Sequence, residues 1–458
     1  MRKLNALYDD TTAQEVQDAA LWRSAPVAQR QSPISPAVYQ QDLDLGLPTS
    51  QMRKGDVRFW SDYNRVFYHP RSVVQLSEYS LNSTIAPFES WATGEELWND
   101  VDREAELIDR DVRVFAEEAD QMQGLQIFTG SDDAWGGWCS KYADALRDEF
   151  GKKSIWTWGL EDTRRVERSK MVLRAANAAK TVQSLGGLVN SYVRIRDGGV
   201  RLPEYMQVDT GNEWESSALI ASAIESVTLP TRLRDGAGLR HARYAEIEHV
   251  LNTNGGQNIL DLGMSAEEYD EVRQSGARSD SRVPQGTSKP DEEEAVRFDL
   301  NFTPAVSSLL PPGATRNKTS KHIFAQAQLT RRSLAAAGLA LTTRPPDREE
   351  MLRRRYHNET IVDNFVVPLP FPKLDSMPHT LFSFPSDGED TSTKRMQVSC
   401  GLSSRASMKS TILELRDVVV RYHRGIAVDE KEEIYNDLTE MGEKYSPGWE
   451  SDGSGDDD

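Results

Sequence analysis

Cysteine is nearly absent from this sequence of 458 residues. The two cysteines, Cys139 and Cys400, cannot build a disulfide framework or a zinc site made of thiolates, and they favour a reducing intracellular compartment. Long apolar runs are missing as well. The richest candidate, residues 334–341, is far shorter than the ~18 residues that a membrane-spanning helix needs. We therefore expect neither a disulfide-rich secreted module nor a transmembrane segment.

The sequence also has no excess of basic residues. The chain has 54 lysines and arginines against 72 aspartates and glutamates, which gives a net charge of −18. Proteins that bind nucleic acid without sequence preference need a basic surface to displace counterions from phosphates, so we expect no direct nucleic-acid binding. Hydrophobic residues make up 38% of the chain and charged residues 28%. This balance predicts a folded body that carries polar insertions.

Residue patterns that mark common catalytic and metal sites are missing too. None of the seven histidines lies three or four residues from another, so a helical pair of zinc ligands is not expected. The sequence has no Walker loop, no Gly-x-Ser-x-Gly elbow and no His-Glu-x-x-His motif. Cys139 has no histidine near it in the sequence and is interpreted as a buried structural thiol. We expect no catalytic residue and no metal.

The strongest fold signal that is present lies between residues 125 and 158. Residues 125–128 and 154–158 are short apolar stretches that predict two β-strands. Between them, an apolar side chain recurs every four residues and predicts a helix that Gly151 ends. These residues are Trp138, Tyr142, Leu146 and Phe150. Strand, helix and strand in this order predict a βαβ unit with parallel strands and a right-handed connection.

Other elements of the first half are predicted from local patterns. Residues 57–60 are interpreted as a short strand after a weakly patterned lead-in. Thr93 and Glu96 have the spacing of a capping box and predict the start of a long helix. An apolar stripe from Leu97 to Met122 continues this helix until Gly124 stops it. Two more helices are predicted over residues 166–185 and 214–229.

The second half is predicted to contain polar segments between shorter elements. Residues 275–294 are interpreted as a disordered insertion, and residues 386–407 as a polar loop. Residues 365–372 are apolar and interrupted by prolines, as in an edge strand. Helices are predicted over 412–422 and 430–441, before an acidic tail. The basic clusters 353–355 and 421–424 could meet an acidic partner, but solvated helix faces are favoured.

The loop inside the βαβ unit is the candidate binding site. Loops between the carboxyl end of a strand and the amino end of a helix hold ligands in many α/β proteins, and the helix dipole there favours an anion. This loop, however, carries two carboxylates and a bulky Trp135, so a capped βα turn is favoured over a nucleotide pocket. Either carboxylate could be the helix N-cap. The candidate residues are Gly130, Ser131, Asp132, Asp133, Gly136 and Gly137.

Five segments of the sequence match one known family: Val57–Ser72, Gln126–Gly137, Trp158–Asp162, Phe365–Pro372 and Arg421–Gly425. Together they resemble the Misato family, the tubulin-related proteins of mitochondrial inheritance, and its fungal members most. The similarity covers roughly residues 2–429. The loop falls where tubulins carry their glycine-rich phosphate loop, and only Gly130, Gly136 and Gly137 match it.

The resemblance implies a tubulin/FtsZ-like α/β fold. The expected organisation is a weakly ordered lead-in (1–55), a Rossmann-like amino-terminal domain (56–230), a second α/β domain (231–408), carboxy-terminal helices (409–449) and an acidic disordered tail (450–458). The amino-terminal domain is expected to lack its first unit, because the sequence starts downstream of the strand and turn with which family members open.

The resemblance also implies a role. The expected protein is non-catalytic and acts in the partitioning of mitochondria and mitochondrial DNA and in mitochondrial distribution. Its expected partners are proteins of the mitochondrial distribution or cytoskeletal machinery. Its expected location is the mitochondrion, peripherally, with a cytoplasmic pool. The alternative is an active GTPase that binds GTP and forms filaments. The loop composition disfavours GTP as a cofactor, because Asp132 and Asp133 would repel its phosphates.

Overall fold

The fold is described from a computed structural model of the chain. Residues 1–33, the predicted insertion 275–294 and the predicted tail 450–458 lie outside the residues that it describes. The described residues are 34–66, 68, 72, 79, 83, 85, 87–162, 164, 166–196, 202–234, 240–252, 255–269, 295–303, 321–332, 345–372, 374–383, 395–422 and 427–447.

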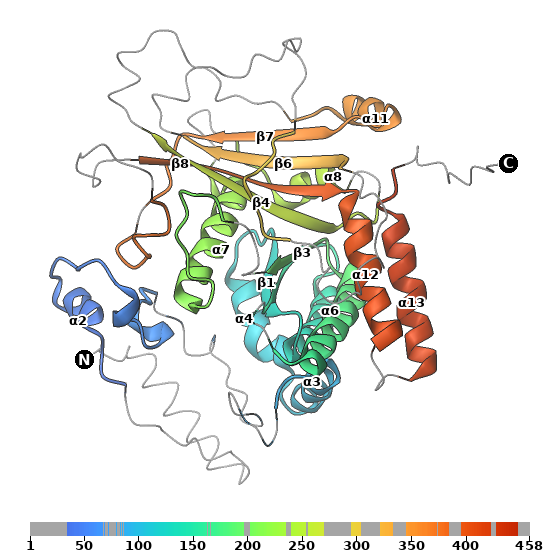
Figure 1. Cartoon of the computed structure of the whole chain (residues 1–458), viewed down its shortest axis with the longest axis horizontal. Coiled ribbons are helices and arrows are strands. Elements are labelled where there is room, and N and C mark those ends of the chain that lie inside the picture. The colour runs from blue at the N-terminus through green and yellow to red at the C-terminus, as the bar shows by residue number, and fades with distance from the viewer. Residues whose placement is uncertain are drawn as a thin grey trace.

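One continuous sheet runs through the molecule (Figure 1). Its strand order is β1-β2-β3-β4-β8-β6-β7, and the short β5 also pairs with β4. The strands β1 to β4 are parallel, β8 is antiparallel to both β4 and β6, and β7 is parallel to β6. The strands are β1 (Gly124–Gly130), β2 (Ser154–Glu161), β3 (Ser191–Arg196), β4 (Ile259–Tyr269), β5 (Leu300–Asn301), β6 (Ile323–Arg331), β7 (Ile361–Val367) and β8 (Arg395–Arg405).

Helices cover this sheet on both faces. On one face, α5, α6, α12 and α13 pack together, and Figure 1 shows α12 and α13 side by side next to α6. On the other face lie α7 and α8. The helices are α2 (Val38–Leu45), α3 (Trp91–Ala105), α4 (Val114–Glu118), α5 (Ala134–Glu149), α6 (Arg168–Leu188), α7 (Glu213–Val227), α8 (Tyr244–Leu251), α11 (Arg348–Tyr356), α12 (Ser407–Tyr422) and α13 (Val428–Glu443).

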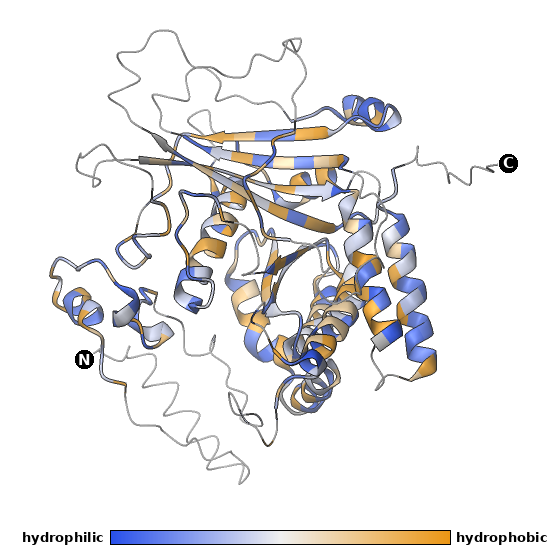
Figure 2. Ribbon diagram, in the orientation of Figure 1, coloured by the Kyte–Doolittle hydropathy of each residue, from blue (hydrophilic) through white to orange (hydrophobic). Residues whose placement is uncertain are grey.

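The two faces are built from alternate residues of the same strands. In β2, Ile155 packs under α5 and α6, whereas Trp156 and Trp158 pack on the α7 and α8 side. In β4, Ile259 packs on the α5 and α6 side, and Leu260 packs on the α7 and α8 side. Successive side chains of a strand point to opposite faces, so a strand covered on both faces buries consecutive residues, as β2 does. Figure 2 shows strands that mix hydrophobic and hydrophilic residues, whereas helix α11 is largely hydrophilic.

The predicted βαβ unit is confirmed. Strands β1 and β2 pair in parallel from Gly124 with Ser154 to Gly130 with Leu160, and α5 connects them. The predicted helices at 166–185, 214–229, 412–422 and 430–441 correspond to α6, α7, α12 and α13. Of the edge strand predicted over residues 365–372, only 365–367 lie in a strand, because β7 starts earlier and ends at Val367. The position of β7 at the end of the sheet makes it an edge strand, as predicted.

The strand predicted for residues 57–60 is wrong. This stretch follows the 3₁₀ turn Lys54–Asp56 and leads into the turn Trp60–Asp62. The reason is Asp62, whose buried carboxylate accepts hydrogen bonds from the backbone N–H groups of Arg58 and Phe59. A side chain that bonds to nearby backbone donors competes with strand pairing and favours a turn.

The predicted capping box at Thr93 is also wrong. Helix α3 begins two residues earlier, at Trp91, and its N-cap residue Ser90 makes no side-chain capping bond. The Trp91 N–H instead donates to Asn177 Oδ1 on helix α6 at 3.0 Å. A helix-terminal donor can be satisfied by any suitable acceptor, so a tertiary contact replaces the local cap here.

The single long helix predicted up to Met122 is broken into three parts. Helix α3 ends at Ala105, Glu106 is left-handed with a φ of 47°, and a π-helix over Ile108–Arg113 precedes α4. The Asp102 carboxylate accepts a hydrogen bond from the Leu107 N–H at 3.0 Å and so caps the interruption. Apolar spacing predicted the buried face but not this break.

The polar loop predicted for residues 386–407 contains a strand that the sequence analysis missed. Strand β8 occupies Arg395–Arg405 and lies between β4 and β6 near the centre of the second half of the sheet. Every second residue in it is apolar and buried, which is the signal that could have identified the strand. These buried residues are Met396, Val398, Cys400 and Leu402.

The lead-in predicted as weakly patterned includes helix α2. Its Tyr39 packs with Met52 and with Trp214 of α7, and all three are buried. Asp375 accepts hydrogen bonds from the hydroxyls of Tyr39 and Thr49. The segment is therefore attached to the main body by a small apolar cluster and a shared carboxylate.

Helices α3 and α5 approach each other closely through glycine. A Cβ atom added to Gly137 would lie 1.9 Å from the Trp91 carbonyl oxygen, and one added to Gly94 would lie 1.7 Å from that of Ala134. Real Cβ atoms do not come so near to backbone atoms, so only glycine permits this packing.

We predict that Gly137→Ala destabilises the protein by about 1–3 kcal/mol, because the backbone of α3 must move to accept the methyl group. Gly187→Ala in α6 is the matched control, since a Cβ atom there meets nothing within 4 Å. The control should be neutral or stabilising by up to about 1 kcal/mol. Urea unfolding followed by circular dichroism measures both variants. Equal stability of the two variants would contradict the prediction.

Candidate functional site at the end of strand β1

The candidate loop lies where the sequence predicted it, between the end of β1 and the start of α5. Asp133 is the N-cap of α5, and its carboxylate accepts a hydrogen bond from the Trp135 N–H at 2.8 Å. This confirms that one of the two carboxylates caps the helix. The Gly136 N–H donates to the Asp133 carbonyl oxygen at 3.2 Å. Both donors at the helix start are therefore bonded within the loop itself.

Neighbouring elements hold the rest of the loop in place. The Ser131 N–H donates to the Leu160 carbonyl at the end of β2. From α6, the Thr181 hydroxyl donates to the Ser131 carbonyl at 2.9 Å, and the Asn177 amide donates to the Asp132 carbonyl at 3.0 Å. Asn177 is the same residue that receives the first N–H of α3. Loop, strand and two helices are thus joined by one set of buried hydrogen bonds.

The glycines of the loop serve packing in this structure. A Cβ atom on Gly136 would lie 2.2 Å from the Thr181 hydroxyl, and Gly137 faces the backbone of α3. A Cβ atom on Gly130 would lie 2.7–2.8 Å from the carboxylate oxygens of Asp133. That carboxylate therefore lies directly against the glycine that resembles part of the tubulin phosphate loop.

A buried charge cluster lies beside the loop at the ends of β2 and β3. Glu161 accepts a hydrogen bond from Arg194 Nε at 2.6 Å and forms an ion pair with Arg196 at 3.3 Å. Glu161 and Arg194 are 7% and 2% exposed, so water screens their attraction poorly. Within the described part of the chain, Arg194 Nη1 has no hydrogen-bond partner. Replacing either member of such a buried pair strongly destabilises a protein, because the other charge is left buried without a partner.

Asp132 is buried next to this cluster. Burial, together with the negative charges of Glu161 and Asp133, raises the pKa of the Asp132 carboxyl to about 8, although Arg174 acts in the opposite direction. Asp132 Oδ2 accepts a hydrogen bond from the Asp162 N–H at 3.0 Å. At pH 7 the favoured form of Asp132 is therefore neutral, whereas the sequence analysis treated it as a negative charge.

A family model described as a tubulin domain matches residues 49–233. Protein dml1 of Aspergillus clavatus is 40% identical over all of this chain, which covers 86% of that relative. Protein dml-1 of Neurospora crassa is 39% identical, with 87% of the relative covered. The chain belongs to the Misato, or DML1, family. A more distant member, Protein DML1 of Yarrowia lipolytica, is 25% identical over 96% of this chain and is covered to 81%.

The family membership confirms the predicted tubulin-like α/β fold. The tubulin-domain match spans the candidate loop and the buried charge cluster. The stretch Trp158–Asp162, which carried part of the family resemblance, forms the end of β2 and supplies Glu161. The segment at residues 57–66 is organised around Asp62, as described above. With Asp132 in the segment Gln126–Gly137, three of the quoted family segments therefore contain buried carboxylates that bond to neighbouring residues.

The sequence analysis missed Glu161, Arg194 and Asn177 as parts of the site. Arg194 lies between the buried Val193 and Ile195 in β3, and a charge buried among apolar strand residues is a signal for a buried partner. Asn177 lies in the middle of α6, where nothing in its local sequence indicates the loop that it holds.

The remaining candidates of the sequence analysis lie elsewhere. Cys139 is buried in α5, and burial raises the pKa of its thiol to about 12, as fits a structural residue. In the described ranges, no group of three or more histidine, cysteine, aspartate or glutamate residues is placed to hold a metal ion. No helix in the described part of the chain is long and apolar enough to cross a bilayer. Arg353, Arg354 and Arg355 form the last turn of α11.

We predict that Asp132→Asn changes how stability depends on pH. The raised pKa means that the folded protein holds a proton that the unfolded chain releases between about pH 4 and pH 8. The free energy of unfolding of the parent chain therefore falls as the pH rises through this window. The variant keeps an acceptor for the Asp162 N–H and has no proton to lose, so at pH 9 it should be more stable than the parent by about 2 kcal/mol or more.

Urea unfolding at pH 5, 7 and 9 measures this effect. Asp144→Asn on the exposed side of α5 is the matched control and should change stability by less than about 0.5 kcal/mol. Stability curves of the parent and of Asp132→Asn that stay parallel from pH 5 to pH 9 would contradict the prediction.

Proposed function

We propose that this protein is a non-catalytic, tubulin-related protein that acts in the inheritance and distribution of mitochondria and in the partitioning of mitochondrial DNA. Membership of the Misato family supports the pathway. The proposed partners are proteins of the mitochondrial distribution or cytoskeletal machinery, bound by a scaffold that does not use a nucleotide. A fold alone does not carry an activity, so the non-catalytic part of the proposal depends on the site.

The observation that carries the non-catalytic part is the position of the Asp133 carboxylate against Gly130. A phosphate cradle needs backbone N–H groups that face an open space and a positive local field. Here the Trp135 N–H already donates to Asp133, and the Gly136 N–H donates to the Asp133 carbonyl. Two of the N–H groups that could hold a phosphate are thus bonded within the loop. The alternative, a GTPase that forms filaments, would require this arrangement to open.

We predict that the protein does not bind GTP more tightly than about 100 μM. Isothermal titration calorimetry with GTP and magnesium is the measurement, because a divalent ion could bridge a carboxylate to a phosphate. The double variant Asp132→Asn/Asp133→Asn should also fail to bind, since asparagine remains a good N-cap and leaves the loop bonds in place. Micromolar binding of GTP to the unsubstituted protein would refute the non-catalytic proposal and favour the GTPase.

We predict that a fluorescently tagged protein is found on mitochondria as well as in a cytoplasmic pool. An alkaline carbonate wash should release the mitochondrial fraction into the supernatant, as expected for peripheral attachment. Cell fractionation and immunoblotting measure both properties. Absence from mitochondria would exclude the proposed location, and resistance to the carbonate wash would exclude peripheral attachment.

A further inference from the structure

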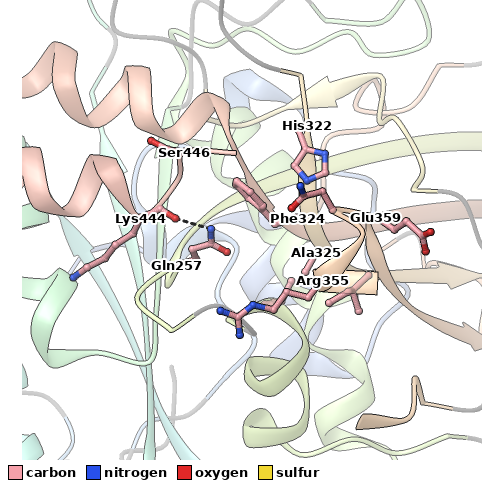
Figure 3. A pocket seen from close by; sticks show the side chains of 11 residues that line it. Gln257, His322, Phe324, Ala325, Arg355, Glu359, Lys444 and Ser446 are labelled. Carbon is pink, nitrogen blue, oxygen red and sulfur yellow. Dashed lines mark hydrogen bonds between the residues drawn. The ribbon is translucent and has the colours of Figure 1, made fainter. Parts of the chain in front are cut away.

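A pocket near the α11–β7 turn is lined by several polar side chains that have partners within the protein (Figure 3). The Gln257 side-chain amide donates to the Lys444 carbonyl at 2.7 Å, as the dashed line in Figure 3 shows. The Lys444 ammonium pairs with Glu440 at 3.2 Å. The Ser446 hydroxyl donates to the Glu443 carboxylate at 3.1 Å. Because these groups are bonded to the chain itself, they do not mark a ligand site.

The buried Asp132 in the β1 loop has a different environment. Its side chain is 7% exposed and accepts a hydrogen bond from the Asp162 N–H at 3.0 Å. Two further carboxylates act on it, those of Asp133 next in the loop and of Glu161 at the end of β2. Negative charges placed together away from water oppose ionisation of one another. The closed loop therefore favours the neutral form of Asp132.

The arginines around this part of the loop are paired with other carboxylates, which limits how far they can stabilise an ionised Asp132. Arg164, which is 63% exposed, pairs with Asp162 at the surface. The remaining three lie deeper, one on α6 and two on β3. The pairs that they form are Arg174 with Asp162 at 2.8 Å, Arg194 with Glu161 at 2.6 Å and Arg196 with Glu161 at 3.3 Å.

The backbone next to Asp132 is held by helix α6. The Asn177 amide donates to the Asp132 carbonyl, and Asn177 Oδ1 accepts the Trp91 N–H at the start of α3, each at 3.0 Å. The Thr181 hydroxyl donates to the Ser131 carbonyl at 2.9 Å. If Asp132 moves out toward water, its carbonyl leaves Asn177. The loop and the start of α3 are thus linked through one side chain.

Local opening of the loop is favoured by rising pH. Burial and the neighbouring carboxylates raise the pKa of Asp132 in the closed loop to about 8, whereas a hydrated aspartate has a pKa of about 4. Between these pH values the open loop releases a proton that the closed loop keeps. Each pH unit in this window therefore shifts the equilibrium toward opening by up to about 10-fold. Such local opening does not require the sheet to unfold.

We propose that the β1 loop is a pH-dependent latch, which is closed on α6 while Asp132 holds its proton and opens as the pH rises, so that the start of α3 is released. The proposal concerns regulation of this loop and is independent of the mitochondrial role. The open loop carries an ionised Asp132 beside Asp133, and these charges repel a phosphate. Opening therefore does not create a GTP site.

Hydrogen–deuterium exchange of the full chain at pH 6 and pH 8, followed by mass spectrometry, tests this proposal. Rates are converted to protection factors, which removes the effect of pH on intrinsic exchange. Protection of the amides in residues 131–137 should fall by at least about 10-fold from pH 6 to pH 8. Protection of the peptide that contains the Trp91 N–H should fall with it. At each pH the loop should be less protected than residues 155–158 of β2, because opening is local.

Asp132→Asn keeps an acceptor for the Asp162 N–H and has no proton to lose. Its loop protection, corrected in the same way, should differ by less than about 2-fold between the two pH values. Asp144→Asn on the exposed side of α5 is the matched control and should keep the pH dependence of the parent. Equal melting temperatures at pH 6 show that both variants fold.

Three results would overturn the latch. The first is loop protection that changes by less than about 2-fold between pH 6 and pH 8 in the parent. That result is expected if the ionised Asp132 stays inside and pairs with Arg194 Nη1, which has no hydrogen-bond partner among the described residues. The second is an equal fall in Asp132→Asn. The third is equal protection of the loop and of β2, which would show that the loop exchanges only by global unfolding.

Discussion

Strand β4 is the element on which the rest of the structure depends, because it joins the two halves of the sheet. Its first residues, Ile259 and Leu260, pair in parallel with β3, and almost all of its length pairs antiparallel with β8. Where β4 begins, the buried Tyr445 hydroxyl accepts a hydrogen bond from the Ile259 N–H and donates one to the Ile259 carbonyl. The segment that follows α13 is thereby attached to the middle of the sheet.

The β1 loop shows how a tubulin-like framework can keep its architecture while the chemistry of one loop differs. Glycines at the matching positions remain, but here they permit close approach of α3 and α6 to α5. The carboxylate of Asp133 lies against Gly130, and Asp132 joins a buried cluster with Glu161. A loop bonded to its own side chains is stable without a ligand, whereas a phosphate site leaves donors exposed until the ligand arrives. The same backbone path therefore supports a structural role.

The charged groups at the end of β1 interact mainly with one another. The buried Arg194 donates a hydrogen bond through Nε to the Glu161 carboxylate, and Arg196 forms an ion pair with the same carboxylate. Arg194 Nη1 has no hydrogen-bond partner among the described residues. Removing either member of such a buried pair strongly destabilises a protein, so this cluster fixes the ends of β2 and β3 relative to each other.

The sequence by itself determined the βαβ unit, most helices and an N-cap at Asp132 or Asp133, because each depends on spacing within a short segment. It could also have revealed β8 from its alternation. Tertiary structure alone decided that the first N–H of α3 bonds to Asn177 and that Glu161 pairs with Arg194 across 33 residues of sequence. It also decided that burial raises the pKa of Asp132. Such features depend on which side chains meet after folding and on how much water is excluded around them. Neither property follows from the residues of a short segment alone.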